Sequence, residues 1–394
     1  MGGGSNTNQL PVSRPRARDI GVVIGEYLQP GPLNAITDVP RVKVGAHEKF
    51  LGDTSSTDEE ERKKIVRAGV TLIAVDDITT KPVFAGLGVL QGSGELTGAH
   101  FIAESGLLTD TIAITGTAQV GLVHHAMQSH IPGALLLPIV AETYDRMTHP
   151  FTSPSQVGTD EVEKAFANLS NGPVREGNTG GGASMVSFAM KGGTGTSSRV
   201  VPGRDGKEYT VGVLVQANHG APYDLVIDGV KVGQTLSKEG YMDPWYPKHE
   251  EGRKVKQPQD GEGSIIVIVA TDAPLLPHQC SAVARRAGVG IARGGGGTMF
   301  FSGDIFLCFS TAPPLTPPLP PKFETRMEPV STYSVEAVNS ETLDIIFRAA
   351  ADATEEAILN ALFAAEDMEG YTGRKWRALP VERVKEILKE AGRI

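Results

Sequence analysis

Short apolar segments separated by turn-forming residues are the dominant pattern along the chain. β-Branched residues are concentrated in six such segments, each bounded by Gly, Pro or Asp: 70–75, 82–89, 135–139, 210–217, 264–270 and 305–309. This pattern is typical of buried strands. The first two segments are separated only by a turn rich in Asp and Thr, so they are predicted to form a hairpin.

Helical periodicity is found in fewer segments. Apolar residues recur at helical spacing over 343–362, with Ser340 as the predicted N-cap and Gly370 as the predicted stop. A second helix is expected over 277–286, because its first residue is a proline, which favours the first turn of a helix. A third is predicted over 380–390. The chain is therefore expected to combine many short strands with a few helices.

The composition is that of a folded globular protein. Of 394 residues, 40% are hydrophobic and 21% charged. The length fits two domains or one large domain. The 37 Lys and Arg residues against 46 Asp and Glu residues give a net charge of −9, which argues against nucleic-acid binding. No apolar segment is long enough to span a bilayer, so no membrane association is expected.

The ends and the cysteines indicate the compartment. Residues 1–13 lack the basic start and apolar run of a signal peptide and are expected to form a flexible arm. Only Cys280 and Cys308 are present, which leaves no disulfide framework and no paired-cysteine metal site. A cytoplasmic location is predicted.

Several common catalytic motifs are missing from the sequence. The nine histidines include no His-Glu-x-x-His spacing, no serine stands in Gly-x-Ser-x-Gly, and no phosphate-binding Gly-x-x-x-x-Gly-Lys loop occurs. We therefore predict no metal and no cofactor.

Ser264 is the remaining candidate for chemistry. A polar, turn-rich segment at 248–263 changes abruptly into the apolar strand that Ser264 begins. If the bond before Ser264 were cut, its hydroxyl and a free α-amine would lie on one residue. An α-amine has a pKa of about 7.7–8.0 and is a competent base near neutrality. This is the arrangement of an N-terminal nucleophile, although a serine at a strand start also fits an ordinary turn residue.

Residues 263–279, Gly-Ser-Ile-Ile-Val-Ile-Val-Ala-Thr-Asp-Ala-Pro-Leu-Leu-Pro-His-Gln, resemble the self-cleaving junction of a known family. This is the L-aminopeptidase/D-esterase and β-peptidyl aminopeptidase family (DmpA/BapA type). Further segments resemble its motifs in the same order, so that the match spans residues 14–390: 16–21, 30–40, 66–71, 94–98, 176–178, 191–199, 302–307 and 354–362.

The resemblance implies a fold and an assembly. Residues 14–394 would form a single catalytic domain, an α/β fold of the four-layer α/β/β/α sandwich type, with the active serine on an inner strand. Self-cleavage at Gly263–Ser264 would give fragments 1–263 and 264–394, which remain associated. The processed pairs would assemble into a homotetramer.

The resemblance also assigns roles to individual residues. Ser264 would attack first the Gly263 carbonyl and later the substrate carbonyl. Asn218 would donate to the oxyanion, and Tyr144 would assist there. Ser302 and Asp304 would hold and tune the nucleophile and its amine. Taken singly, the residues other than the nucleophile also fit ordinary turn or interface positions.

Substrate recognition is expected to differ from the family pattern. Glu142 would bind the free ammonium group of the substrate. Where the family commonly has asparagines, this chain has Gln91-Gly-Ser-Gly-Glu and Thr115-Gly116-Thr. Phe300 and Phe301 replace a more polar segment, so that a more apolar acyl group is expected.

The predicted function is a self-processing serine aminopeptidase and amidase-esterase. It would release N-terminal residues from small peptides, amides or esters through an acyl-enzyme on Ser264, without metal or cofactor. Two alternatives remain open. One is an acyltransferase or amide-forming enzyme on the same scaffold. The other is a non-catalytic scaffold that uses the proline-rich segment 312–322 for docking.

Overall fold

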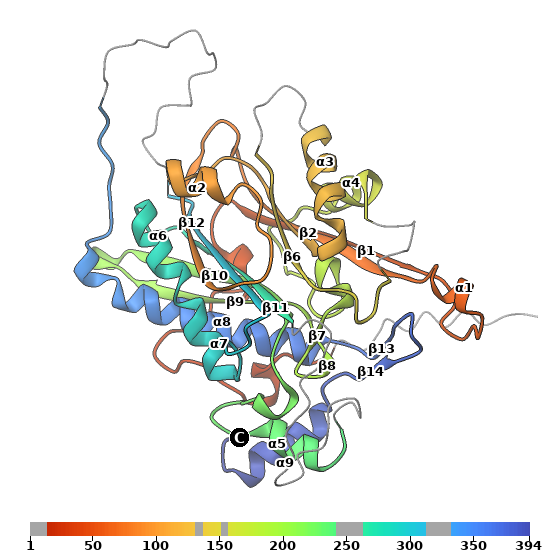
Figure 1. Cartoon of the computed structure of the whole chain (residues 1–394). Helices are drawn as coiled ribbons and strands as arrows, with labels where there is room; N and C mark the ends of the chain where they lie inside the picture. Colours follow the sequence, from red (N-terminus) through yellow and green to blue (C-terminus); the bar gives the residue numbers. More distant parts are fainter. Residues whose placement is uncertain (1–13, 131–136, 151–156, 242–262, 313–331) are drawn as a thin grey trace, which may run out of the picture.

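The computed structural model of the chain describes residues 14–130, 137–150, 157–241, 263–312 and 332–394 (Figure 1). The predicted arm at 1–13, all but the first residue of the proline-rich segment and most of the loop before Ser264 lie outside the described residues.

Two sheets form the centre of the fold. The six-stranded sheet has the order β4-β3-β12-β11-β10-β9: Leu107–Leu108, Val83–Gly92, Gly303–Ser310, Ser264–Thr271, Glu208–Asn218 and Gly193–Pro202. The four-stranded sheet has the order β1-β2-β5-β6: Val42–Leu51, Val66–Val75, Ile112–Gly116 and Ile139–Thr143. Only the pairs β11–β12 and β5–β6 are parallel among these neighbours.

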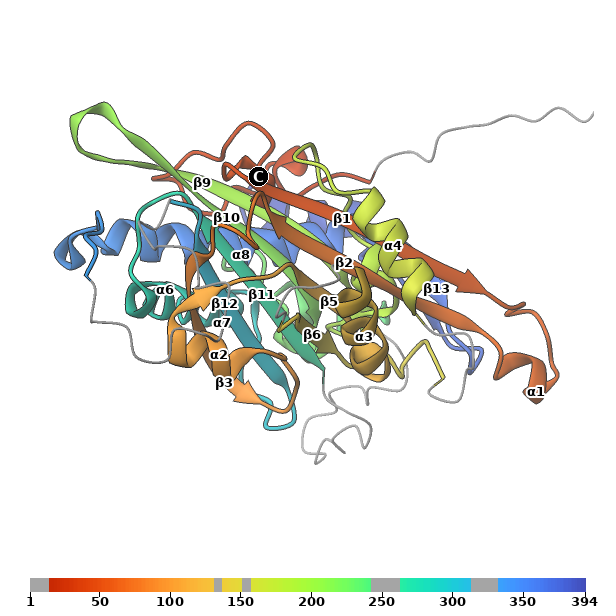
Figure 2. The same ribbon diagram turned by 90° about the horizontal axis from the view of Figure 1, so that it is seen from above.

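Helices cover the outer face of each sheet (Figures 1 and 2). The six-stranded sheet packs against α6 (Pro277–Ala284), α7 (Ala287–Gly294) and α8 (Asp344–Ala364). The four-stranded sheet packs against α3 (Val120–His130) and α4 (Thr159–Ala167). The layers are therefore helix, sheet, sheet and helix, and the prediction of an α/β fold is confirmed.

Strand β11 shows why this layering follows from the sequence. Ile266 and Ile268 belong to the apolar core between the two sheets, whereas Ile265 and Val267 belong to the core under the helices. Successive strand residues point to opposite faces, so a strand buried on both faces needs an uninterrupted apolar run. Alternation continues to the first residue, and the Ser264 side chain faces the space between the sheets.

Shorter elements complete the chain: α1 (Glu59–Arg62), α2 (Ala99–Ser105), α5 (Val232–Lys238), α9 (Val381–Glu390), and the paired strands β7–β8 (Val186–Ser187 and Met190–Lys191) and β13–β14 (Met368–Glu369 and Lys375–Trp376). The two small hairpins are connected, because the Lys191 N–H donates to the Arg377 carbonyl oxygen at 2.8 Å.

Strands β10, β11 and β12 and helices α8 and α9 confirm the corresponding predictions. The hairpin of 70–75 with 82–89 is wrong. Strand β2 pairs with β1 and β5, whereas β3 pairs with β12 and β4 in the other sheet. The turn between them crosses from one sheet to the other, because β1 and β12 supply long ladders of ten and eight residue pairs that local sequence cannot reveal.

Other boundaries also differ from the expectations. Strand β6 begins at Ile139, where the predicted strand ended. Ser340 opens a short 3₁₀ turn instead of capping α8, which starts at Asp344, and α8 ends at Ala364, before Gly370. The helix expected over 277–286 is confirmed as α6, which ends two residues early, at Ala284. A further helix, α7, follows from Ala287, and its Gly290 packs closely against α8, because a Cβ there would lie 2.5 Å from the Ala351 carbonyl oxygen.

Within the described residues, no helix combines the length and the apolar composition needed to cross a membrane.

Candidate active site

Ser264 is the first residue of the central strand β11 and is 2% exposed. It lies between Asn218 on β10 and Gly303 on β12, its partners in the two flanking ladders. Its hydroxyl donates to the carbonyl oxygen of Gly263 at 2.6 Å and accepts from the Gly303 N–H at 3.3 Å. The hydroxyl is therefore held against the peptide unit that precedes it.

Gly263 has no space for a side chain. Its φ is +83°, in the left-handed region that favours glycine. A Cβ at this position would lie 2.2 Å from the carbonyl oxygen of Asn218. The sharp approach of the chain to Ser264 thus depends on a glycine at this position.

Asn218 is fixed from two sides. Its Oδ1 accepts from the Val186 N–H at 2.7 Å, and its Nδ2 donates to the Tyr144 carbonyl oxygen at 3.0 Å. A side-chain amide has two N–H groups, so the second N–H of Asn218 remains for another acceptor. These bonds hold a buried donor at the residue paired with Ser264.

Ser302 and Asp304 flank Gly303, the residue opposite Ser264. The Ser302 hydroxyl donates to Asp304 Oδ1 at 2.5 Å, and burial raises the pKa of Asp304 to about 6 against the lowering effect of that bond and of a bond from the Ile265 N–H. The bond to Ile265 places the Asp304 carboxyl one residue along the main chain from Ser264.

Glu142 lies at the end of β6 and is buried. Its Oε1 accepts from the Glu95 N–H at 3.1 Å, and its Oε2 accepts from the Thr117 hydroxyl. Burial raises the pKa of Glu142. A Cβ on Gly94 would lie 3.1 Å from Glu142 Oε1 and 3.3 Å from the Gly303 Cα, so Gly94 separates the carboxyl from the strand beside Ser264.

The two departures from the family pattern have structural reasons. A Cβ on Gly116 would lie 1.9 Å from Asp145 Oδ2, so the Asp145 carboxyl fills the space that a side chain at 116 would need. Burial raises the pKa of Asp145 to about 7. Gln91 has a side-chain amide, as the asparagine of the family pattern does. Its Nε2 donates to the Gly297 carbonyl oxygen at 3.1 Å and so connects β3 to the loop before Ser302.

Phe300 and Phe301 lie directly before Ser302 but at the surface. They are 82% and 63% exposed and pack edge to face, with 5.1 Å between their ring centroids. The structure thus brings Ser264, Asn218, Ser302, Asp304 and Glu142 together around one strand end and leaves the phenylalanines at its margin.

Three groups at the site are not found by sequence reasoning: the Gly303 N–H, the Thr117 hydroxyl and the Val186 N–H. Gly303 and Thr117 lie inside motifs already singled out, which is a signal for them. Val186 has no such signal, because every residue other than proline carries a backbone N–H.

A cleft beside Asn218 is the second feature of this region, and Tyr144 lies at its start. With Arg146, Met147 and the turn at 371–374, Tyr144 lines this cleft of about 470 Å³. The Tyr144 carbonyl oxygen is the one that accepts from the Asn218 amide, so the cleft adjoins Asn218.

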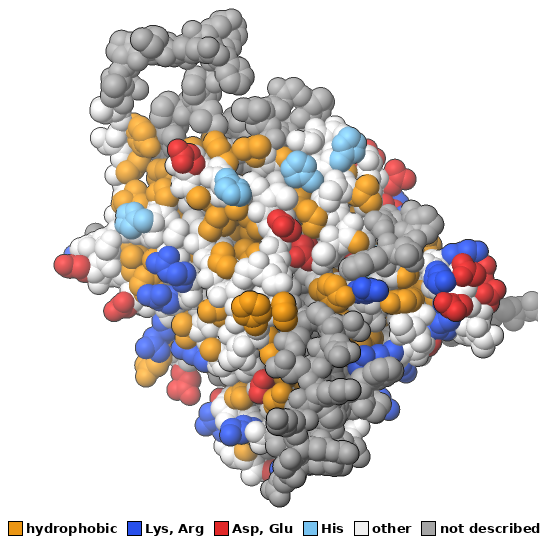
Figure 3. All heavy atoms as spheres, in the orientation of Figure 1, with side chains coloured by type: hydrophobic (Ala, Val, Ile, Leu, Met, Phe, Trp, Pro, Cys, Tyr) orange, Lys and Arg blue, Asp and Glu red, His pale blue; other side chains and the backbone are white. Residues whose placement is uncertain are grey.

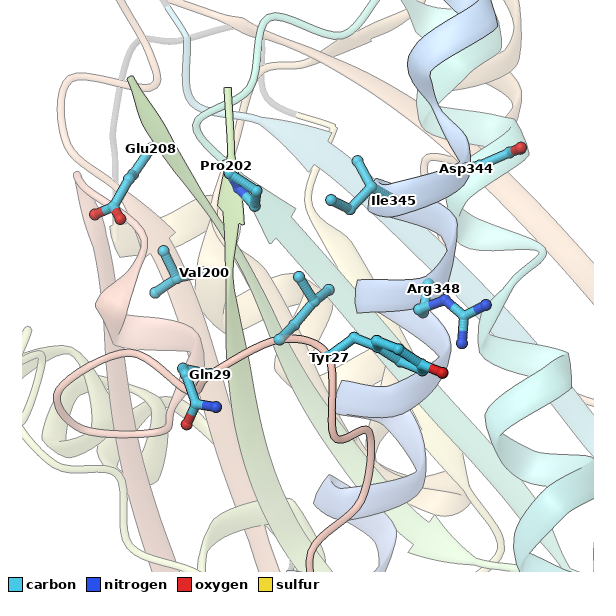
Figure 4. A pocket seen from close by; sticks show the side chains of 9 residues that line it. Tyr27, Gln29, Val200, Pro202, Glu208, Asp344, Ile345 and Arg348 are labelled. Atoms are coloured by element: carbon cyan, nitrogen blue, oxygen red, sulfur yellow. The ribbon is translucent and has the colours of Figure 1, made fainter. Parts of the chain in front are cut away.

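A larger cleft of about 600 Å³ lies away from this chemistry (Figure 4). It is lined by residues around Tyr27, Pro202, Glu208 and the first turn of α8, and the guanidinium of Arg348 lies 5.1 Å from the Tyr27 ring centroid. Glu208 and Asn218 are the two ends of β10, roughly 30 Å apart at the rise of an extended strand. We therefore assign this cleft no part in the chemistry of Ser264.

Histidine side chains on the face in Figure 3 are scattered and not clustered. Among the described residues, no group of three His, Cys, Asp or Glu side chains is placed to hold a metal ion.

A buried serine on a central strand, with an amide donor beside it and a hydroxyl–carboxyl pair opposite, has the components of a serine hydrolase. The family comparison agrees. Residues 34–376 match the model of peptidase family S58, and the chain belongs to this family. It is therefore a hydrolase of the peptidase class.

Curated relatives support the same assignment. The chain is 40% identical over 384 residues to the β-peptidyl aminopeptidase BapA of Sphingosinicella xenopeptidilytica, covering 95% of this chain and 91% of the relative. It is 39% identical over 388 residues to BapA of Sphingosinicella microcystinivorans, covering 96% and 93% of the two chains.

Solved structures show the same fold. A β-aminopeptidase from a Burkholderia species is 39% identical, with a TM-score of 0.80 and coverage of 96% of this chain and 99% of its own. The L-aminopeptidase D-Ala-esterase/amidase of Ochrobactrum anthropi, described as a variant of the Ntn hydrolase fold, is 39% identical, with a TM-score of 0.79 and the same coverage. The resemblance to this family is confirmed, and neither acyl transfer nor a non-catalytic scaffold is favoured.

Proposed function

We propose that the chain is a self-processing serine aminopeptidase and amidase-esterase with Ser264 as its nucleophile. The observation that carries the proposal is the hydrogen bond of 2.6 Å between the Ser264 hydroxyl and the Gly263 carbonyl oxygen. This bond joins the nucleophile to the peptide group that maturation would cleave. The relatives named as aminopeptidases support the reaction class.

Maturation would begin with attack of Ser264 Oγ on the Gly263 carbonyl carbon. The C–N bond to the Ser264 nitrogen breaks, that nitrogen takes the proton of the hydroxyl, and an ester forms between Gly263 and Ser264 Oγ. Water then hydrolyses the ester. The products are a carboxylate on Gly263 and a free α-amine on Ser264, and the fragments 1–263 and 264–394 stay associated through the six-stranded sheet, which both supply.

Turnover would use the new α-amine as the general base for the Ser264 hydroxyl. The acyl-enzyme forms as the substrate C–N bond breaks and the leaving amine takes the proton. The remaining Asn218 N–H would stabilise the oxyanion. Asp304, bonded to the Ile265 N–H, lies on the main-chain side of Ser264, so its effect would be on the α-amine and not on the hydroxyl.

Glu142 would bind the substrate's free ammonium group. Its carboxyl is buried beside the strand end, and an ammonium would supply the opposite charge that the buried carboxyl needs. The exposed Phe300 and Phe301 would contact an apolar part of the substrate at the margin of the site. Small peptides, amides and esters with a free amine are the expected substrates.

The intact mass of the purified protein tests the proposal. We expect the native chain to separate into two fragments, the smaller of which begins at Ser264, and we expect the Ser264→Ala protein to remain one chain. A serine elsewhere on the same strand system, Ser310→Ala, is the matched control and should be cut. Cleavage of the Ser264→Ala protein at the same bond, or an uncut native chain without hydrolysis of any free-amine substrate, would contradict the proposal.

We also propose a cytoplasmic location and a homotetramer of processed pairs. Cys280 and Cys308 are both free and buried, and the Cys280 thiol donates to the Phe84 carbonyl oxygen at 3.8 Å, which fits a reducing compartment. Light scattering of the processed protein measures the assembly, and a mass of one or two pairs at working concentration would contradict the tetramer.

A further inference from the structure

The cleft beside Tyr144 is cationic. The loop after β6 supplies Tyr144 and Arg146, and the β13–β14 turn supplies Tyr371 and Arg374. The seven residues that line it include two arginines and two tyrosines and no acidic side chain. Guanidinium and phenol groups are hydrogen-bond donors to carboxylate oxygens.

Both arginines are anchored. The guanidinium of Arg374 lies 3.7 Å from the ring centroid of Trp376, whose Nε1 donates to the Met147 carbonyl oxygen at 3.3 Å. Hydrogen bonding to Tyr144, and then to Tyr371, raises the pKa of Arg146. The positive charge therefore persists at every working pH, and the indole and the phenols restrict where it lies.

A third arginine fixes the turn itself. Arg62 Nε donates to the Tyr371 carbonyl oxygen at 2.7 Å, and its Nη2 donates to the Gly370 carbonyl oxygen at 3.2 Å. Its counter-ion is Glu369, at 3.6 Å. Glu369 is thus engaged by Arg62 outside the set of residues that line the cleft.

The Glu142 carboxyl and the arginines of the cleft place opposite charges at two ends of the proposed site. Glu142 and Tyr144 are two residues apart at the end of β6, and the Tyr144 carbonyl holds the oxyanion donor Asn218. Glu142 lies beside the strand that carries Gly303. A substrate with its ammonium at Glu142 and its scissile carbonyl at Ser264 would direct its leaving group towards Tyr144 and the arginines.

We propose that this cleft binds the carboxylate of the leaving amino acid, so that the favoured substrates are dipeptides with a free amine and a free α-carboxylate. The inference rests on the proposed function and adds the substrate class to it. The α-carboxylate of a dipeptide lies two bonds from the scissile nitrogen, which requires a cationic cleft close to the oxyanion donor. Tyr144 meets this requirement, because it lines the cleft and its carbonyl oxygen accepts from Asn218. During hydrolysis the acyl C–N bond breaks, the nitrogen takes a proton, and the carboxylate leaves unchanged.

The test compares acids with amides. The processed protein is assayed with alanyl-glycine and β-alanyl-glycine and with the C-terminal amide of each. We expect kcat/KM to be about tenfold higher for the acids, the value of roughly one charge-assisted hydrogen bond. Alanyl-aspartate α-amide carries a side-chain carboxylate but no α-carboxylate. It therefore shows whether the cleft binds the α-carboxylate or any carboxylate of the leaving group.

Variants assign the preference to the cleft. Arg146→Gln should lower the acid-to-amide ratio about tenfold, and Arg146→Lys should restore part of it because the charge is retained. Arg374→Gln provides a second, independent removal of charge. Arg204→Gln, an exposed arginine in the turn at the far end of β9, is the control that should leave the ratio unchanged.

Two results would overturn the inference. One is an equal kcat/KM for acids and amides, and the other is a preference that survives both glutamine substitutions. If no substrate at all is hydrolysed, the proposed function fails instead, and calorimetric binding of alanyl-glycine against its amide then tests the cleft without turnover. A preference for the side-chain carboxylate alone would overturn the assignment to the α-carboxylate.

Discussion

Replacement of Asn218 by alanine separates two contributions of one side chain, to stability and to catalysis. In the folded protein its amide bonds Val186 N–H at 2.7 Å and the Tyr144 carbonyl oxygen at 3.0 Å, and a second N–H remains for the oxyanion. Asn218→Ala removes all three donors and acceptors from a buried position.

The expected magnitudes follow from these contacts. A buried backbone group left without a partner costs about 1–3 kcal/mol, so the two freed groups should lower the free energy of unfolding by roughly 2–6 kcal/mol. Loss of one oxyanion donor lowers kcat by about 10²–10³-fold. The proposed self-cleavage would pass through the same kind of oxyanion on Gly263, so its rate should fall by a similar factor.

Gln216 is the matched control on the same strand and the same face. Its Nε2 donates to the Thr115 carbonyl oxygen at 2.9 Å and to the Thr143 hydroxyl at 2.7 Å. Gln216→Ala should therefore destabilise the fold comparably without slowing either reaction beyond about twofold.

Urea unfolding measures the stability of both variants, a gel time course measures cleavage, and steady-state kinetics measures turnover of an amide substrate. The reasoning would be refuted if Asn218→Ala matured and turned over at rates close to those of Gln216→Ala, since the amide would then be only structural.

Three further predictions concern pH, the junction and the ammonium site. Because burial raises the pKa of Asp304 to about 6, the contribution of this carboxyl to stability is present below about pH 4 and is lost as the pH rises through about 6. Relative to the native protein, Asp304→Asn should therefore gain up to about 3 kcal/mol of unfolding free energy between about pH 4 and pH 8. An equal difference between the two proteins at both pH values in urea titrations would contradict this. Gly263→Ala should slow self-cleavage more than about tenfold in a gel time course, because a Cβ at this position has no space. The control is Gly206→Ala, which has a φ of +74° and nothing within 4 Å of its Cβ position, and it should mature at the native rate. Equal rates for the two variants would show that the close approach of Gly263 to the Asn218 carbonyl oxygen does not matter. Glu142→Gln should lower kcat/KM for free-amine substrates roughly tenfold or more, mainly by raising KM. Substitution of the exposed Glu95 by Gln should leave kcat/KM unchanged. An unchanged KM in Glu142→Gln would show that Glu142 does not bind the substrate.

The departures from the family pattern show what a sequence comparison leaves out. Gly116 suggests a lost amide donor, but the space is filled by the Asp145 carboxyl, which no local motif announces. Gln91 retains a side-chain amide, but this amide donates to the Gly297 carbonyl oxygen. The chemistry lost or kept at such positions depends on neighbours that are distant in sequence.

The sequence alone predicts the strands and helices that are strongly apolar, because a segment such as 264–271 is buried on both faces wherever it lies in the fold. It also determined the candidate nucleophile, because the change from a polar loop to an apolar strand at Ser264 is a local signal.

Which strands pair and which groups meet is visible only in the folded chain. Strand β3 pairs with β12 and not with β2, and this pairing places Gln91 opposite Asp304. The Gly303 N–H meets Ser264, the Val186 N–H meets Asn218, and two arginines lie beside Tyr144, each through contacts between elements that are far apart in the chain. Pairing partners and backbone donors are properties of neighbours in space, and a linear pattern of side chains does not contain them.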